Sequence, residues 1–145
     1  MKSVLSALAI TLALTSAAQA RDTIGNYDLK ETMALEQTRT ALGEDVAFYF
    51  GDQSYGKVAK DFGEYRTNKK TNAFNKSDKE ACQWVFLSAM KSLKDRAIAE
   101  GGNAVVEIKS NYRNNLTKSS ETFQCGAGTF VAGVALVGKV VKLDK

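Results

Sequence analysis

Residues 77–108 have the sequence SDKEACQWVFLSAMKSLKDRAIAEGGNAVVEI, and this stretch decides the fold class. It opens with a capping box, in which the Ser77 oxygen accepts a backbone amide of the first turn and Glu80 reaches back to the cap. Apolar residues then recur every three or four positions until Gly101-Gly102 ends the pattern. The sequence predicts one long amphipathic helix, whose apolar positions are Cys82, Phe86, Ala89, Met90, Leu93 and Ala97.

Strand-like segments surround this helix. Residues 104–108 follow the glycines directly, and residues 122–125 and 134–143 are further apolar strands. Upstream, residues 45–50 are predicted to be a strand buried on both faces, residues 62–67 a second strand, residues 29–42 a weaker helix, and residues 69–76 a polar loop. A helix followed by consecutive strands predicts a single α+β domain, with one long helix packed on a mostly antiparallel sheet.

The first twenty residues are typical of a cleavable secretory signal. Lys2 supplies the positive charge, residues 4–14 form an apolar run too short to cross a bilayer, and Ala18-Gln19-Ala20 is a small-x-small cleavage site. We expect cleavage after Ala20, which leaves residues 21–145 as a soluble periplasmic domain. No cysteine at the junction would accept a lipid. The alternative is an uncleaved N-terminal anchor.

Histidine is absent and cysteine occurs twice. Without histidine the chain lacks the usual general base near neutral pH and the commonest metal ligand. In an oxidising compartment the even pair Cys82 and Cys125 predicts a disulfide, which would stabilise the fold by roughly 4 kcal/mol through loop closure. The alternatives are a redox or metal-binding pair, but the C-x-x-C spacing is missing and two thiolates alone do not complete a zinc site. We therefore expect no metal and no cofactor.

Positive charge is concentrated in one stretch. After removal of Lys2 the net charge is +3, too mild to indicate nucleic-acid binding. Residues 57–79 alone carry +4, so the rest of the mature chain is nearly neutral. Residues 113–118 form a separate polar loop that contains Arg113. The stretch is able to dock on anionic lipid, lipopolysaccharide or an acidic protein, or its lysines simply keep an edge strand soluble. The candidate basic surface consists of Lys57, Lys60, Arg66, Lys69 and Lys70.

Two short motifs imitate catalytic signatures. Residues 51–57 match the P-loop pattern G-x-x-x-x-G-K, but Val58 replaces the magnesium-binding hydroxyl and no helix is predicted to follow. Ser88 and Lys91 match the S-x-x-K of penicillin-recognising enzymes, but in the middle of the predicted helix. We expect a glycine-bounded turn at the first motif and ordinary helix surface at the second. The sequence therefore predicts no catalytic and no cofactor-binding residue.

Several segments resemble known families. Residues 97–106, AIAEGGNAVV, resemble the helix end and strand start of YbjQ and RcsF-like domains. Phe62-Gly63-Glu64, Ala81-Cys82-Gln83 and Cys125-Gly126 resemble the RcsF arrangement, in which a Cys-Gln opening the helix is bridged to a later cysteine. Nearly the whole chain, including residues 48–53 and 67–74, resembles small exported bacterial proteins commonly labelled "excinuclease ATPase subunit".

The resemblance implies a binding role. RcsF-like proteins sense or relay envelope stress through protein contacts, although they are lipid-anchored and use two disulfides. YbjQ-like domains are described as heavy-metal-binding and tend to form rings. Soft metals bind thiolate or imidazole, but this chain has no histidine and its two cysteines are expected to be bonded. We expect a non-catalytic periplasmic binding or envelope-stress module. The alternatives are a self-assembling structural protein with an interface at residues 131–143, or a small enzyme using convergent carboxylates or a lysine.

Overall fold

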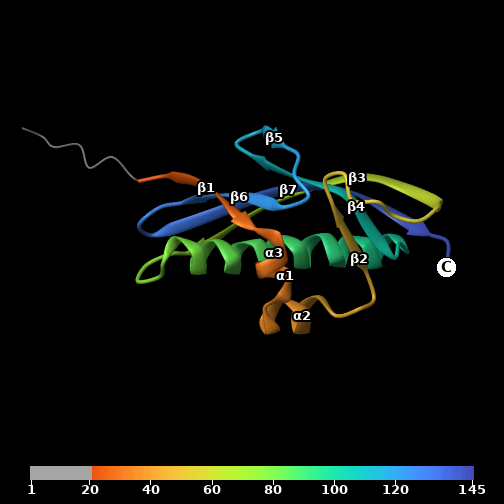
Figure 1. Ribbon diagram of the computed structural model, residues 1–145, viewed down its shortest axis with the longest axis horizontal. Helices are drawn as coiled ribbons and strands as arrows, with labels where there is room; N and C mark the ends of the chain where they lie inside the picture. The colour runs from red at the N-terminus through yellow and green to blue at the C-terminus, as the bar shows by residue number, and fades with distance from the viewer. Residues whose placement is uncertain (1–20) are drawn as a thin grey trace, which may run out of the picture.

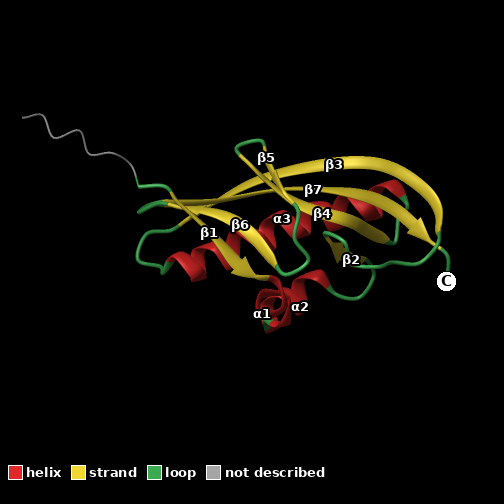
Figure 2. Ribbon diagram, turned by 45° about the horizontal axis from the view of Figure 1, so that its top comes forward, coloured by secondary structure: helices red, strands yellow, loops and turns green. Residues whose placement is uncertain are grey.

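The computed structural model describes residues 21–145, so the predicted signal at residues 1–20 lies outside the described part. One long helix covers one face of a curled seven-stranded sheet, and two short helices lie beside it (Figures 1 and 2). This confirms the predicted single α+β domain. The elements are β1 (Thr23–Asp28), α1 (Leu29–Ala34), α2 (Glu36–Leu42), β2 (Ala47–Phe50), β3 (Val58–Asn72), α3 (Asp78–Glu100), β4 (Ala104–Tyr112), β5 (Asn115–Thr117), β6 (Thr122–Ala127) and β7 (Val131–Leu143).

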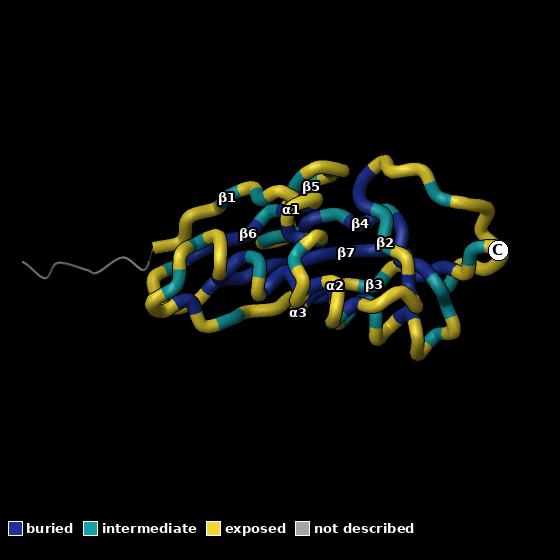
Figure 3. Tube along the Cα trace, turned by 60° about the horizontal axis from the view of Figure 1, so that its bottom comes forward, coloured by how far each residue is buried: buried dark blue, intermediate teal, exposed yellow. Residues whose placement is uncertain are grey.

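Strand β7 is the centre of the sheet. Along one edge it pairs antiparallel with β3 from Val131 to Leu143, and along the other edge it pairs with β6 and then β4. Strand β1 extends the sheet beyond β6, and β2 extends it beyond β4 as the parallel pair. The trace of β7 is buried through the middle of the molecule (Figure 3). Most of residues 132–141 are therefore interior to the sheet, whereas Val131 is 49% exposed, and an interface at residues 131–143 stays a prediction.

Helix α3 is capped as the sequence predicts. The Ser77 hydroxyl oxygen accepts the Glu80 amide at 3.1 Å, and Gly101 ends the helix in the left-handed conformation with a φ of 86°. The buried face of the helix lies against β7, β3 and β6. Phe86 of the helix stacks on Phe123 of β6 with ring centroids 4.1 Å apart, which places the largest side chains at the centre of the core.

A glycine in β7 makes room for side chains of the neighbouring strand β4. A Cβ atom at Gly138 of β7 would lie 2.6 Å from a methyl group of Val105 and 3.2 Å from a side-chain carbon of Ile108. Leu93 of α3 closes the same space at 3.8 Å. The core at this point is packed with no room for one methyl group.

Replacing Gly138 by alanine should therefore lower the free energy of unfolding by about 1–3 kcal/mol, because the added methyl group overpacks the core. Urea denaturation measures the change. Gly56→Ala is the matched control, since nothing lies within 4 Å of a Cβ at Gly56, and it should change stability by less than about 0.5 kcal/mol. Equal stability of both variants would contradict the packing account.

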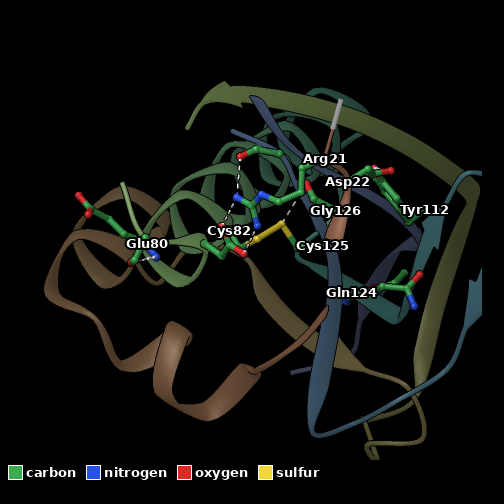
Figure 4. Close-up of a disulfide and its surroundings, with 12 residues drawn as sticks. Arg21, Asp22, Glu80, Cys82, Tyr112, Gln124, Cys125 and Gly126 are labelled. Carbon is green, nitrogen blue, oxygen red and sulfur yellow. Dashed lines mark hydrogen bonds and ion pairs between the residues drawn. A yellow bond between two sulfur atoms is a disulfide. The ribbon is translucent and has the colours of Figure 1, made fainter. Parts of the chain in front are cut away.

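The predicted disulfide is present. Cys82 of α3 and Cys125 of β6 are bonded, with Cα atoms 5.9 Å apart, and both residues are fully buried (Figure 4). The bond joins residues 43 apart in the sequence and fastens the beginning of the helix to the sheet. No free cysteine remains in residues 21–145.

Replacing both Cys82 and Cys125 by alanine should lower the free energy of unfolding by about 4 kcal/mol, the entropic contribution expected for a loop of this length. Dithiothreitol should destabilise the wild type by a similar amount and leave the double variant unchanged. A wild type whose unfolding midpoint in urea is insensitive to the reductant, once thiol counting shows the bond reduced, would contradict this role.

Several predicted elements differ in extent. The helix expected at residues 29–42 is two helices, α1 and α2, because Leu35 takes an extended ψ of 139° between them. Strand β2 is an edge strand in which only Phe50 is buried, not a strand buried on both faces. The loop expected at residues 69–76 is strand as far as Asn72, because β3 is an edge strand whose exposed residues are polar.

Candidate binding groove

The face of the sheet opposite α3 carries a groove at the end where β6 turns into β7. Its floor is made of small residues. Gly126 and Gly133 pair with each other there, and their neighbours Ala127 and Ala132 face the core on the helix side. The side chain of Tyr112 occupies the space above Gly126, where a Cβ atom would lie 2.0 Å from the tyrosine oxygen. The glycines thus allow the β4–β5 hairpin to fold over this part of the sheet.

The groove has two walls from distant parts of the sequence. One wall is β3, where Arg66, Asn68 and Lys70 pair with Val137, Ala135 and Gly133 and so share the outer face by strand alternation. The other wall is the β4–β5 turn, where Arg113 and Asn114 have φ values of 52° and 62°, as a type I′ turn requires. Two depressions of about 270 and 430 Å³ share Asn68 and Arg113 as lining residues. We call them together the binding groove, and define it by Arg66, Asn68, Lys70, Asn111, Arg113, Asn114, Gly133 and Ala135.

The binding groove is electropositive. Arg113 forms an ion pair with Asp22. The Tyr112 hydroxyl, which lies beside Asp22 in Figure 4, donates to the same carboxylate at 3.0 Å. Burial, and then the bond to Asp22, raise the pKa of Tyr112, so this hydroxyl stays protonated. Arg66 and Lys70 are in none of the ion pairs within residues 21–145. Two cations therefore remain uncompensated in the groove.

The predicted basic surface is divided by the fold. Arg66 and Lys70 lie in the binding groove, whereas Lys69 is on the opposite face of β3. Lys57 precedes β3, and Lys60 lies between two irregularities of that strand with its ammonium 5.0 Å from the Phe62 ring centroid. Arg113, which the sequence placed in a separate polar loop, joins the groove through tertiary structure alone.

The two motifs that match catalytic signatures, residues 51–57 and Ser88 with Lys91, do not form the corresponding sites. Residues 51–57 connect β2 to β3 and no helix follows them, so the P-loop geometry is absent. A Cβ atom at Gly51 would lie 2.7 Å from a backbone atom of Ser119, so close packing explains the glycine at this position. Ser88 is in the middle of α3, and its hydroxyl donates to the Trp84 carbonyl at 3.4 Å.

At the other end of the outer face, two carboxylates form ion pairs with the same lysine. The Lys139 ammonium lies 3.4 Å from Glu107 and 3.7 Å from Asp61. Glu107 has a φ of 52° at an irregularity in the β4–β7 pairing. The hydrogen bond and charge of Glu107, and then the charge of Asp61, raise the pKa of Lys139. The amine therefore stays protonated at neutral pH and is not available as a nucleophile.

Residues 21–145 contain no group of three or more cysteine and acidic side chains that could hold a metal ion. None of the helices in this part of the chain has the length and apolar character needed to span a bilayer. Comparison with protein-family models, with curated proteins and with solved structures found no match for this chain.

An ion pair fixes the rim of the groove to α3. The Arg21 guanidinium donates to both oxygens of Asp78, each at 2.8 Å, and also to the Gly128 carbonyl at 3.1 Å. Asp78 is the first residue of α3, where a negative charge is also favoured by the helix dipole. The hydrogen bond to Arg21, followed by its charge, lowers the pKa of Asp78. Strand β1 is thus held to the start of the helix.

Because the pKa of Asp78 is lower in the folded state, its contribution to stability exists at neutral pH and is lost as the pH falls below about 4. Asp78→Asn should lower the unfolding midpoint in urea at pH near 7, and the difference from wild type should shrink toward pH about 2.5. The control Asp95→Asn removes an exposed carboxylate of the same helix that makes none of the ion pairs of residues 21–145. A pH-independent effect of Asp78→Asn would be evidence against this linkage.

Proposed function

We propose that this chain is an exported, non-catalytic binding module of the periplasm, and that its binding groove recognises an anionic component of the envelope. The observation that carries the proposal is the meeting of Arg66 and Lys70 of β3 with Arg113 of the β4–β5 turn over a floor of small residues. Guanidinium groups match phosphate and carboxylate oxygens, and the groove amides of Asn68, Asn111 and Asn114 supply further donors.

Export is supported by the disulfide. Cys82 and Cys125 are fully buried and join the helix to the sheet, so the bond is part of the core. Such structural disulfides persist in oxidising compartments. The signal-like residues 1–20 and the resemblance to exported RcsF-like proteins favour the same compartment, and the resemblance adds the expectation of a role in envelope stress.

A binding role accounts for the groove better than catalysis does. The chain has no histidine, and the pKa of Lys139 is raised by its carboxylate neighbours. The Asp61–Lys139–Glu107 cluster is the arrangement that would favour an enzyme, because two carboxylates converge there. However, the three side chains keep 38–50% of their surface exposed to solvent, whereas general acid–base pairs are tuned by deeper burial.

Self-assembly through the free edge of β3 is the other alternative. A long unpaired edge is a template for pairing with another chain. Strand β3 is protected in two recognised ways: it carries lysines, and its pairing with β7 is irregular between Val58 and Lys60 and again between Asp61 and Gly63. These features disfavour pairing of β3 with a second chain, and they favour a binding role for the outer face of the sheet.

The test compares two charge reversals on the same strand. Arg66→Glu with Lys70→Glu should weaken binding of residues 21–145 to a fluorescent oligoglutamate peptide or to lipopolysaccharide by more than about 10-fold at low salt, because the groove becomes acidic. Lys57→Glu with Lys60→Glu makes the same change of net charge outside the groove, and should weaken binding by less than about 3-fold. Fluorescence anisotropy measures both.

Equal losses in the two double variants would mean that net charge alone attracts the probes, and the groove would not be the site. The absence of binding by the wild type to either probe at low salt would refute recognition of anionic components by this groove.

A further inference from the structure

A second surface lies at the end of the molecule where α3 begins. The loop between β3 and α3 and the turn between β6 and β7 are joined there, since the Ala73 amide donates to the Phe130 carbonyl at 2.8 Å. The rings of Phe74 and Phe130 stack with centroids 5.7 Å apart and planes inclined by 14°. Val131 follows directly in the sequence. We call Phe74, Phe130 and Val131 the aromatic tip.

The aromatic tip contains the two exposed phenylalanines of residues 21–145. Phe74 is 53% exposed, Phe130 64% and Val131 49%, whereas the remaining phenylalanines are buried or half-buried. The two rings cover each other, but no other element covers them. Clustered apolar surface of this kind marks a contact with a partner or a membrane.

Three lysines lie in the segment of chain that leads into and contains Phe74 of the aromatic tip. Lys76 is in the same loop as Phe74, and Lys69 and Lys70 are near the end of β3 that leads into it. None of the three is in an ion pair within residues 21–145. The nearby carboxylates of Asp78 and Glu31 are paired with Arg21 and Lys79 respectively, which leaves Glu80 as the acidic residue of this end outside those ion pairs. The end is therefore net positive.

The start of the described chain is at this same end. Arg21 donates to the carbonyl of Gly128 in the β6–β7 turn, so the described chain begins beside this turn (Figures 1 and 2). Val131 also lines the depression that contains Lys70 and Arg113, so the binding groove opens next to the tip.

We propose that the aromatic tip docks this protein end-on to a bilayer of anionic lipids. The stacked rings of Phe74 and Phe130 lie at the boundary between headgroups and acyl chains, and Lys69, Lys70 and Lys76 contact the lipid phosphates. Aromatic side chains favour this boundary, and lysines nearby add attraction to an anionic surface. This goes beyond the proposed groove function, since docking through the tip does not require an occupant in the groove.

Vesicle sedimentation tests the proposal. Residues 21–145 should bind vesicles of phosphatidylcholine with about 30% phosphatidylglycerol, and should bind pure phosphatidylcholine vesicles at least about 10-fold more weakly. Phe74→Ser with Phe130→Ser should reduce binding to the anionic vesicles at least about 10-fold. The matched control is Ile98→Ser with Leu116→Ser, which removes apolar side chains that are 52% and 64% exposed elsewhere.

A fluorescence measurement places the tip directly and does not depend on the serine variants. Trp84 is the one tryptophan of the chain, so Phe130→Trp in a Trp84→Phe background gives a single reporter at the tip. Its emission should shift to shorter wavelength on anionic vesicles. Binding without a blue shift, equal loss in the control variant, or no binding to the vesicles would each overturn the proposal. Retained oligoglutamate binding by the tip variant would separate this result from the groove function.

Discussion

The packing of α3 on β7 is the constraint on which the rest of the structure depends. Gly138 of β7 leaves room for the side chains of Val105 and Ile108 of β4 at the point where Leu93 of α3 packs. The Cys82–Cys125 disulfide fixes the beginning of the helix to β6. The stacked rings of Phe86 and Phe123 lie in the same core. A small domain has a limited core, so one covalent bond between its two layers contributes a large share of its stability.

The central position of β7 determines where charge and apolar surface are exposed. Because β6 and β4 occupy one edge of β7, β3 takes the whole of the other edge and has no neighbour beyond it. An edge strand with a solvated outer face is able to carry Arg66, Lys70 and other polar residues without cost to the core. The β6–β7 turn then meets the β3–α3 loop at one end, where Phe74 and Phe130 stack outside the core. The strand order therefore places the binding groove and the aromatic tip next to each other.

Local patterns in the sequence predicted the core but not the surface. The Ser77 cap, the helical spacing as far as Gly101 and the Cys82–Cys125 bond are each signalled within one element or by cysteine count, and the structure contains all three. Of the predicted capping box, the structure gives the bond from the Glu80 amide to Ser77. Strand β1 was missed because residues 23–28, TIGNYD, lack an alternating apolar pattern and gain their place by pairing with β6. The groove was missed for a similar reason: Arg66 and Arg113 are brought together by Tyr112 packing over Gly126, a contact between strands that no sequence spacing reveals.

Helix and sheet together form a two-layer scaffold that presents the binding groove and the aromatic tip at one end. Amide hydrogen exchange of residues 21–145, with and without vesicles containing phosphatidylglycerol, tests this most directly. The account predicts added protection in residues 66–76, 111–114 and 128–131, with no change in α2 or in β2. Protection centred on α2 and β2, or an unchanged exchange pattern under conditions where the vesicles are bound, would contradict it.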